Sequence, residues 1–264
     1  MPLEPDYLGC SNRNQSSYLN EMTAAAHFNL SSYAERLVIE RRKLPLAQAI
    51  RDALQIRSIE VDLMLARDSS EALAYSYDNQ IDQPNHHRNA SETALLWHVI
   101  LLYARATKTS SKVRKQFEVR AKLNVNEKAV HDELCDLRDL AIAHYGHGGS
   151  YTGNWVREIA VVEIDNEGSS RVAVFSRHQV ADRPLLVRAR EAIDSALAIV
   201  SPVSTKRMTA LMEALAADAE PDPEAAFAEI AAHRLNAGIF LGSEEQAAAA
   251  MTADDARGEF HHNG

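Results

Sequence analysis

Apolar residues recur at helical spacing along most of the chain. The spacing favours a helix from about residue 19 to 43, and Pro45 is well placed as the first residue of the next one. Residues 59–65 alternate as in a strand, but no turn separates them from the preceding helix. We therefore favour one continuous helix there.

The middle of the chain predicts two further helices. The segment 94–104 is apolar nearly all round, which is typical of a helix at the centre of a bundle, and Asn89 or Ser91 can cap it. Asn124 or Asn126 can cap the helix that follows. The buried stripe of that second helix is predicted to comprise Val130, Leu134, Leu137, Leu140 and Ala141.

Two runs rich in β-branched residues then predict a β-hairpin. They cover 155–164 and 171–178 and are joined by the turn-forming sequence DNEGSS. A long helix follows from near Pro184, and Pro202 marks either its end or a kink. The whole pattern predicts a mainly α fold, a helical bundle with a β-hairpin inserted at about 155–178.

We expect three regions along the chain. Residues 1–18 are polar and turn-rich and read as a flexible leader. Residues 19–215 form the helical bundle with its hairpin. Residues 216–264 are rich in alanine and acidic side chains, and form either short helices packed on the body or an acidic tail.

Composition narrows the function classes. Hydrophobic residues make up 46% of the chain, and the net charge of −9 argues against a nucleic-acid coat protein that binds through bulk positive charge. A local basic patch stays compatible with that charge. Cys10 and Cys135 form no disulfide framework, the apolar run 94–104 is too short to span a bilayer, and the N-terminus lacks the features of a signal peptide. We therefore expect a soluble cytoplasmic protein without membrane contact.

Arg138 is the residue that demands a chemical explanation. In a helix its neighbours three and four positions away are apolar or neutral, although Asp132, Asp136 and Asp139 lie within one or two turns. A guanidinium does not lose its proton to escape burial, so we expect it to meet a partner from outside the helix. That partner is either a structural carboxylate or a phosphate.

His144 follows Arg138 six positions later. Arginine suits a bidentate phosphate contact and histidine suits proton transfer, a combination that serves metal-independent cleavage of a phosphodiester. Rotation of about 100° per residue places the two side chains roughly 120° apart on an ideal helix. They share a cleft if the helix tightens near Gly146, or if two copies of the chain meet across a twofold axis as a homodimer. The alternative is a core arginine tied to an acid of another helix, with His144 facing the helix dipole.

A basic segment, residues 105–122, is the second candidate for contacting nucleic acid. The RNA-binding residues predicted within it are Lys108, Ser110, Ser111, Lys112, Arg114 and Lys115. The alternative is an ordinary solvated face balanced by acids of the C-terminal half. His147 either assists His144 or belongs to a polar loop. No ligand spacing such as HExxH supports a metal site, and we expect no cofactor.

The segment around Arg138 resembles the HEPN superfamily, whose motif is Arg-x4–6-His with Asn, Asp or His after the arginine. The sequence RDLAIAH fits that motif, and residues 131–144 match the pattern H-x-E-L-x-x-L-R-D-x-x-I-A-H of HEPN-like bacterial proteins. The preceding block, LLYARATKTSSKVRKQF, is similar to the helix found ahead of the motif in those proteins. The resemblance covers about 90–150, roughly a quarter of the chain.

The resemblance implies a dimeric bundle of four or five helices and, in catalytic members, a metal-independent ribonuclease of toxin–antitoxin, abortive-infection or other defence systems. It implies that Arg138 stabilises the scissile phosphate and that His144 acts as acid or base. Asp139 would orient one of them, with the RNA 2′-hydroxyl as nucleophile. RNA and an antitoxin protein are the implied partners. Other members are non-catalytic modules that bind RNA or a protein, and this is the alternative function.

Overall fold

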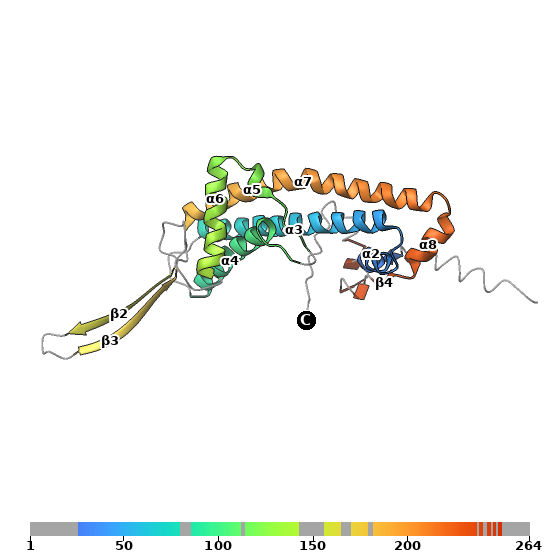
Figure 1. The fold of residues 1–264 in the computed structure, drawn as a ribbon. Helices are drawn as coiled ribbons and strands as arrows, with labels where there is room; N and C mark the ends of the chain where they lie inside the picture. The colour runs from blue at the N-terminus through green and yellow to red at the C-terminus, as the bar shows by residue number, and fades with distance from the viewer. Residues whose placement is uncertain are drawn as a thin grey trace, which may run out of the picture. The chain divides into compact units, whose positions relative to one another are not determined.

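Figure 1 shows a computed structural model of the chain. The described residues are 26–79, 86–111, 114–142, 156–164, 170–178 and 182–236, with the pairs 238–239, 242–243, 245–246 and 248–249. They are mostly helical with one long β-hairpin, which confirms the predicted fold class. No helix among these residues is both long and apolar enough to cross a membrane.

The chain divides into two compact units. The central unit comprises residues 44–216, and the terminal unit combines residues 1–43 with 217–264. The division differs from the expected one, because residues before 44 group with the C-terminal region instead of with the bundle.

Four long helical segments build the central unit. They are α3 (Leu44–Asp78), α4 (His86–Thr107), α6 (Val125–Asp136) with its π-helical continuation η1 (Leu137–Ile142), and α7 (Arg183–Ala219), whose last three residues belong to the terminal unit. The short helix α5 (Val119–Lys122) lies between α4 and α6 in the chain. Helix α3 is continuous through residues 59–65, as favoured from the sequence. Pro202 lies inside α7, so it does not end that helix.

Polar contacts define how α3 and α4 run past each other. Asp62 of α3 accepts hydrogen bonds from Arg105 near the end of α4, while Ser76 donates to Glu92 near its start, at 2.7 Å. The two helices are therefore antiparallel. Between these contacts the apolar faces form the core, whose fully buried side chains include Leu63, Leu73, Leu96, Ile100, Leu134, Leu137, Leu185 and Ile193.

The start of α6 follows the sequence prediction, and the start of α4 does not. Asn124 accepts from the backbone N–H of Glu127, whose carboxylate accepts from the Asn124 N–H, so the two residues form a capping box. Helix α4 already begins at His86, which places Asn89 and Ser91 inside it. The Ser91 hydroxyl donates to the His87 carbonyl, so the predicted cap at these positions is wrong.

A buried histidine joins α4 to α6. The His131 Nδ1 lies 3.1 Å from the Tyr103 hydroxyl, and its Nε2 lies 3.7 Å from the Cys135 sulfur. Burial lowers the pKa of His131 and raises the pKa of the Cys135 thiol to about 11. Both groups are therefore uncharged at neutral pH.

The strands β2 (Val156–Ile164) and β3 (Ser170–His178) pair antiparallel and confirm the predicted hairpin. Val162 lies opposite Val172, and Glu163 lies opposite Arg171, with which it forms an ion pair of 2.6 Å. Val162 and Val172, which share one face of the hairpin, are exposed to solvent by 57% and 72%.

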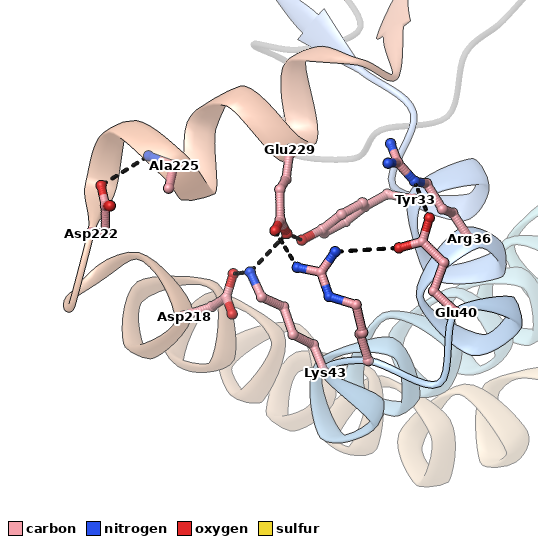
Figure 2. A network of polar contacts seen from close by, with 9 residues as sticks. Tyr33, Arg36, Glu40, Lys43, Asp218, Asp222, Ala225 and Glu229 are labelled. Atoms are coloured by element: carbon pink, nitrogen blue, oxygen red, sulfur yellow. Dashed lines mark hydrogen bonds and ion pairs between the residues drawn. The ribbon is translucent and has the colours of Figure 1, made fainter.

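The terminal unit contains α2 (Leu30–Ile39), α8 (Pro223–Ala231) and a short antiparallel pair of strands, β1 (His27–Phe28) and β4 (Arg234–Leu235). An ion-pair network ties it together (Figure 2). The Lys43 ammonium donates to Asp218 at 2.9 Å and to Glu229 at 2.8 Å, and the Tyr33 hydroxyl donates to Glu229 at 3.1 Å. The hydrogen bond from Lys43 is the main cause that lowers the pKa of Glu229 to about 2. The C-terminal region thus includes a short helix, α8, whose Glu229 binds Tyr33 and Lys43.

Helix α2 ends with a left-handed residue that is not glycine. The N–H of Arg42 donates to the Leu37 carbonyl and the N–H of Arg41 to Val38, which is a Schellman motif with Arg41 at φ 54°. We predict that Arg41→Gly raises the free energy of unfolding by about 1 kcal/mol, because glycine adopts this conformation without a Cβ clash. Urea unfolding measures the change. Arg41→Ala is the control, and an equal gain from alanine would contradict the explanation.

The buried His131 predicts a pH-dependent stability. Below about pH 6.5 the unfolded chain protonates this histidine more readily than the folded chain does, so stability is fully present above that pH and falls as the pH drops. We expect His131→Gln, which cannot be protonated, to lose less stability than the wild type between about pH 7 and pH 5. Thermal unfolding at several pH values tests this, with the exposed His98→Gln as control. Identical pH profiles for wild type and His131→Gln would refute it.

Candidate functional site

The segment that carries Arg138 is not a regular α-helix. Leu137–Ile142 continues α6 as a π-helix, in which hydrogen bonds run between residues five apart, and such turns occur frequently at functional sites. Leu137 is fully buried and anchors the turn, whereas Leu140 is 42% exposed. Regular α-helical rotation would place Arg138 and His144 roughly 120° apart. A wider turn changes that rotation before the described segment ends at residue 142.

Arg138 meets a carboxylate from its own turn. Its Nη1 donates to the Asp139 Oδ1 at 2.5 Å, and the Lys108 ammonium at the end of α4 donates to the other oxygen, Oδ2, at 2.6 Å. The side chains of Arg138, Asp139 and Lys108 are 36%, 28% and 45% exposed. One partly exposed carboxylate therefore holds two cations that solvent can reach.

The pKa values of this cluster favour its charged forms. Burial alone would raise the pKa of Asp139, but the hydrogen bonds from Lys108 and Arg138 outweigh it and lower that pKa. The hydrogen bond to Asp139 raises the pKa of Lys108. Lys108, Asp139 and Arg138 therefore carry one net positive charge among them at neutral pH, and the carboxylate of Asp136 lies close enough to raise the pKa of Lys108 as well.

A second carboxylate, that of Asp62, also holds two cations. Asp62, whose side chain is only 6% exposed, accepts from Arg105 Nε at 2.9 Å and from Arg114 Nη1 at 2.6 Å. The Arg105 side chain is 54% exposed, whereas that of Arg114 is 16% exposed. The hydrogen bond to Asp62 raises the pKa of Arg105.

Arg114 also closes the loop that follows α4. Its Nη2 donates to the Arg105 carbonyl at 2.9 Å, which satisfies an acceptor that the end of the helix leaves open. The side chain that the sequence assigned to RNA is therefore engaged with α3 and α4.

The other predicted RNA-binding residues have different surroundings. Ser110, Ser111 and Lys115 are exposed in the loop. The Ser111 hydroxyl accepts from the Arg114 N–H at 3.1 Å, and the Lys115 carbonyl accepts from the Gln55 side chain at 3.0 Å. Three further predicted site residues lie outside the described residues, namely Lys112, His144 and His147.

The structure thus brings together Lys108, Asp139 and Arg138 from two different helical segments. It adds Arg105, which the sequence analysis included in the basic segment but did not single out. Its partner Asp62 lies 43 residues earlier in the chain, and only the register between α3 and α4 reveals the pair.

Within the described ranges, no three His, Cys, Asp or Glu side chains are grouped so that they could hold a metal ion.

Comparison with models of protein families, with curated proteins and with solved structures finds no match to this chain.

We predict that Asp62→Asn lowers the free energy of unfolding by about 2–3 kcal/mol, because it removes the charge that holds Arg105 and the nearly buried Arg114. The matched control is Asp132→Asn. Asp132 binds Arg120 at 2.8 Å, but that side chain is 45% exposed, so its loss is expected to cost less than about 1 kcal/mol. Chemical denaturation of both variants tests the difference, and equal losses would show that burial of Asp62 does not matter.

Proposed function

We propose that this chain is an RNA-directed, HEPN-like protein in which Arg138 binds a backbone phosphate, and that it acts as a metal-independent endoribonuclease. The observation that carries the proposal is that Arg138 and Lys108 share a single carboxylate and both stay partly exposed. Arg138, Lys108 and Asp139 together are not neutral, and their side chains are accessible to solvent. A phosphate can therefore approach both cations.

The charge balance supports an anionic ligand. Asp139 supplies one negative charge to two cations, so a phosphodiester that joins them completes the neutralisation. Arginine carries five N–H donors, and the ion pair of Arg138 with Asp139 uses Nη1. The remaining donors suit a phosphate, whose oxygens accept bidentate hydrogen bonds from guanidinium.

In the proposed reaction the 2′-hydroxyl attacks the adjacent phosphorus, and the bond from phosphorus to the 5′-oxygen of the next nucleotide breaks. The hydroxyl proton passes to a base, and the departing 5′-oxygen receives a proton from an acid, leaving a cyclic phosphate and a free 5′-hydroxyl. Arg138 and Lys108 stabilise the charge that develops on the phosphate oxygens. We assign proton transfer to His144 on the resemblance to HEPN proteins, and Asp139 orients Arg138.

We further propose that two copies of the chain pair their motifs across a twofold axis and that an antitoxin protein is the natural partner. Both follow from the same resemblance. A composite site would supply two arginines and two histidines, so the acid and the base could come from different subunits.

A second candidate function is a non-catalytic HEPN-like module that binds RNA or a protein. Its support is that Arg138 Nη1 already donates to the Asp139 carboxylate. In that case the cluster would anchor an anion without cleaving it.

The nuclease proposal predicts that the purified protein cleaves labelled RNA in the presence of a chelator. Arg138→Ala and His144→Ala should each reduce the rate on the order of 10²-fold or more, the usual effect of removing a transition-state contact. The matched control is Arg36→Ala, since Arg36 is 47% exposed and ion-paired within the terminal unit, outside this cluster.

The outcomes separate the two candidates. Cleavage that the chelator abolishes, or that Arg138→Ala leaves unchanged, would overturn the nuclease. RNA binding that is weakened by Arg138→Ala, without cleavage by the wild type, would establish the binding module instead.

A further inference from the structure

We infer that Arg105 forms a second phosphate contact beside Arg138 and Lys108, so that the ligand is an RNA strand spanning at least two neighbouring phosphates and not a free nucleotide. The inference rests on the proposed RNA binding and specifies its ligand. It concerns the exposed end of α4, where the two shared carboxylates lie.

The spacing of the cations comes from α4 itself. Arg105 and Lys108 are three positions apart, and the Lys108 N–H still donates to the Ala104 carbonyl at 2.9 Å, so helical geometry reaches Lys108. Side chains at this separation lie on one face of a helix, with Cβ atoms about 5–6 Å apart. Two cations at such a distance can each meet a different phosphate of one strand.

The charge at this end of the helix is positive although the whole protein is acidic. Four cations, namely Arg105, Lys108, Arg114 and Arg138, bind two carboxylates, Asp62 and Asp139, and a third carboxylate, Asp136, lies near Lys108. An excess of one positive charge therefore lies in a chain whose net charge is −9. Phosphates are the groups on RNA that such an excess attracts.

Asp62 cannot by itself neutralise Arg105. Its one charge is shared with Arg114, whose side chain is 16% exposed and is fixed by additional bonds to Ser58 and to the Arg105 carbonyl. Arg105, whose side chain is 54% exposed, binds Asp62 through both Nε and Nη2. Asp62 therefore divides one negative charge between two guanidinium groups, and the more exposed of them, Arg105, can be reached from solvent.

An arginine elsewhere in the basic segment provides a matched comparison. Arg120 on α5 is 52% exposed and binds Asp132 through two hydrogen bonds of 2.8 Å. That pair is one cation to one carboxylate and is neutral. Arg105 and Arg120 therefore have similar exposure and both bind a carboxylate, but only Arg105 shares its carboxylate with another arginine.

The test measures binding of a short labelled oligouridylate with 2′-O-methyl groups, which the proposed reaction cannot cleave, between about 50 and 200 mM salt, the range in which phosphate contacts change affinity most clearly. We expect Arg105→Gln to weaken binding on the order of tenfold and to reduce the salt slope by about 0.7, the value for one phosphate contact of a single strand. Arg105→Lys should retain the slope because it retains the charge. Arg120→Gln should match the wild type.

Uridine monophosphate is the second probe, since it carries one phosphate group. Arg105→Gln should leave its affinity nearly unchanged, whereas Arg138→Ala should weaken it. Thermal unfolding of every variant verifies that the protein is folded under the binding conditions.

These outcomes distinguish a failure of the Arg105 contact from a failure of the proposed RNA binding. If Arg105→Gln binds the oligonucleotide like Arg120→Gln while Arg138→Ala binds it poorly, the second contact is wrong and the RNA proposal stands. If Arg105→Gln weakens uridine monophosphate as much as the oligonucleotide, Arg105 belongs to a single phosphate site and the inference also fails. If the wild type binds neither probe, both fall together.

Discussion

The arrangement at the end of α4 depends on two carboxylates that are each shared by two cations. Asp62 reaches this place from α3 and Asp139 from the π-helical turn, so three separate segments converge on one helix end. Guanidinium groups stay charged when partly buried, and each needs an anion close by. The placement of Asp62 thereby fixes Arg105, the loop carrying Arg114, and the last turn of α4.

The sequence predicted the hairpin and most of the helices because their signals are local, but the helix expected from about 19 to 43 is wrong in part, since His27–Phe28 form strand β1 and α2 covers Leu30–Ile39. Periodic apolar residues, the cap at Asn124 and the β-branched runs on either side of DNEGSS each act within a few residues. The start of α4 was mispredicted for the same reason. Asn89 and Ser91 favour caps, but they are also tolerated inside a helix when their neighbours pack, and the local signal does not distinguish the two.

The polar site was less predictable because its contacts depend on helix register and on a departure from α-helical geometry. Neighbours at three and four positions along the helix left Arg138 without a counterion, as the sequence analysis noted. The observed partner is the next residue, Asp139, on a π-helical turn that no simple pattern predicted. Lys108 was predicted to bind RNA, but its link to Asp139 joins segments 31 residues apart and follows only from the packing of α4 against η1.

Net charge and local charge lead to different conclusions about what this surface binds. A net charge of −9 would repel a polyanion if every charge acted equally at the site. At physiological ionic strength, however, exposed charges separated by more than about 8 Å are largely screened. A phosphate in contact with the end of α4 therefore senses mainly the nearby cations and the two carboxylates they share. By contrast, Arg120 in the central unit binds the single carboxylate of Asp132 at 2.8 Å. A carboxylate shared by two cations also occurs in the terminal unit, where Glu229 binds Arg42 and Lys43. At the end of α4, two such carboxylates are reached by cations of one helix end, and this charge sharing, not the number of basic residues, determines the local charge.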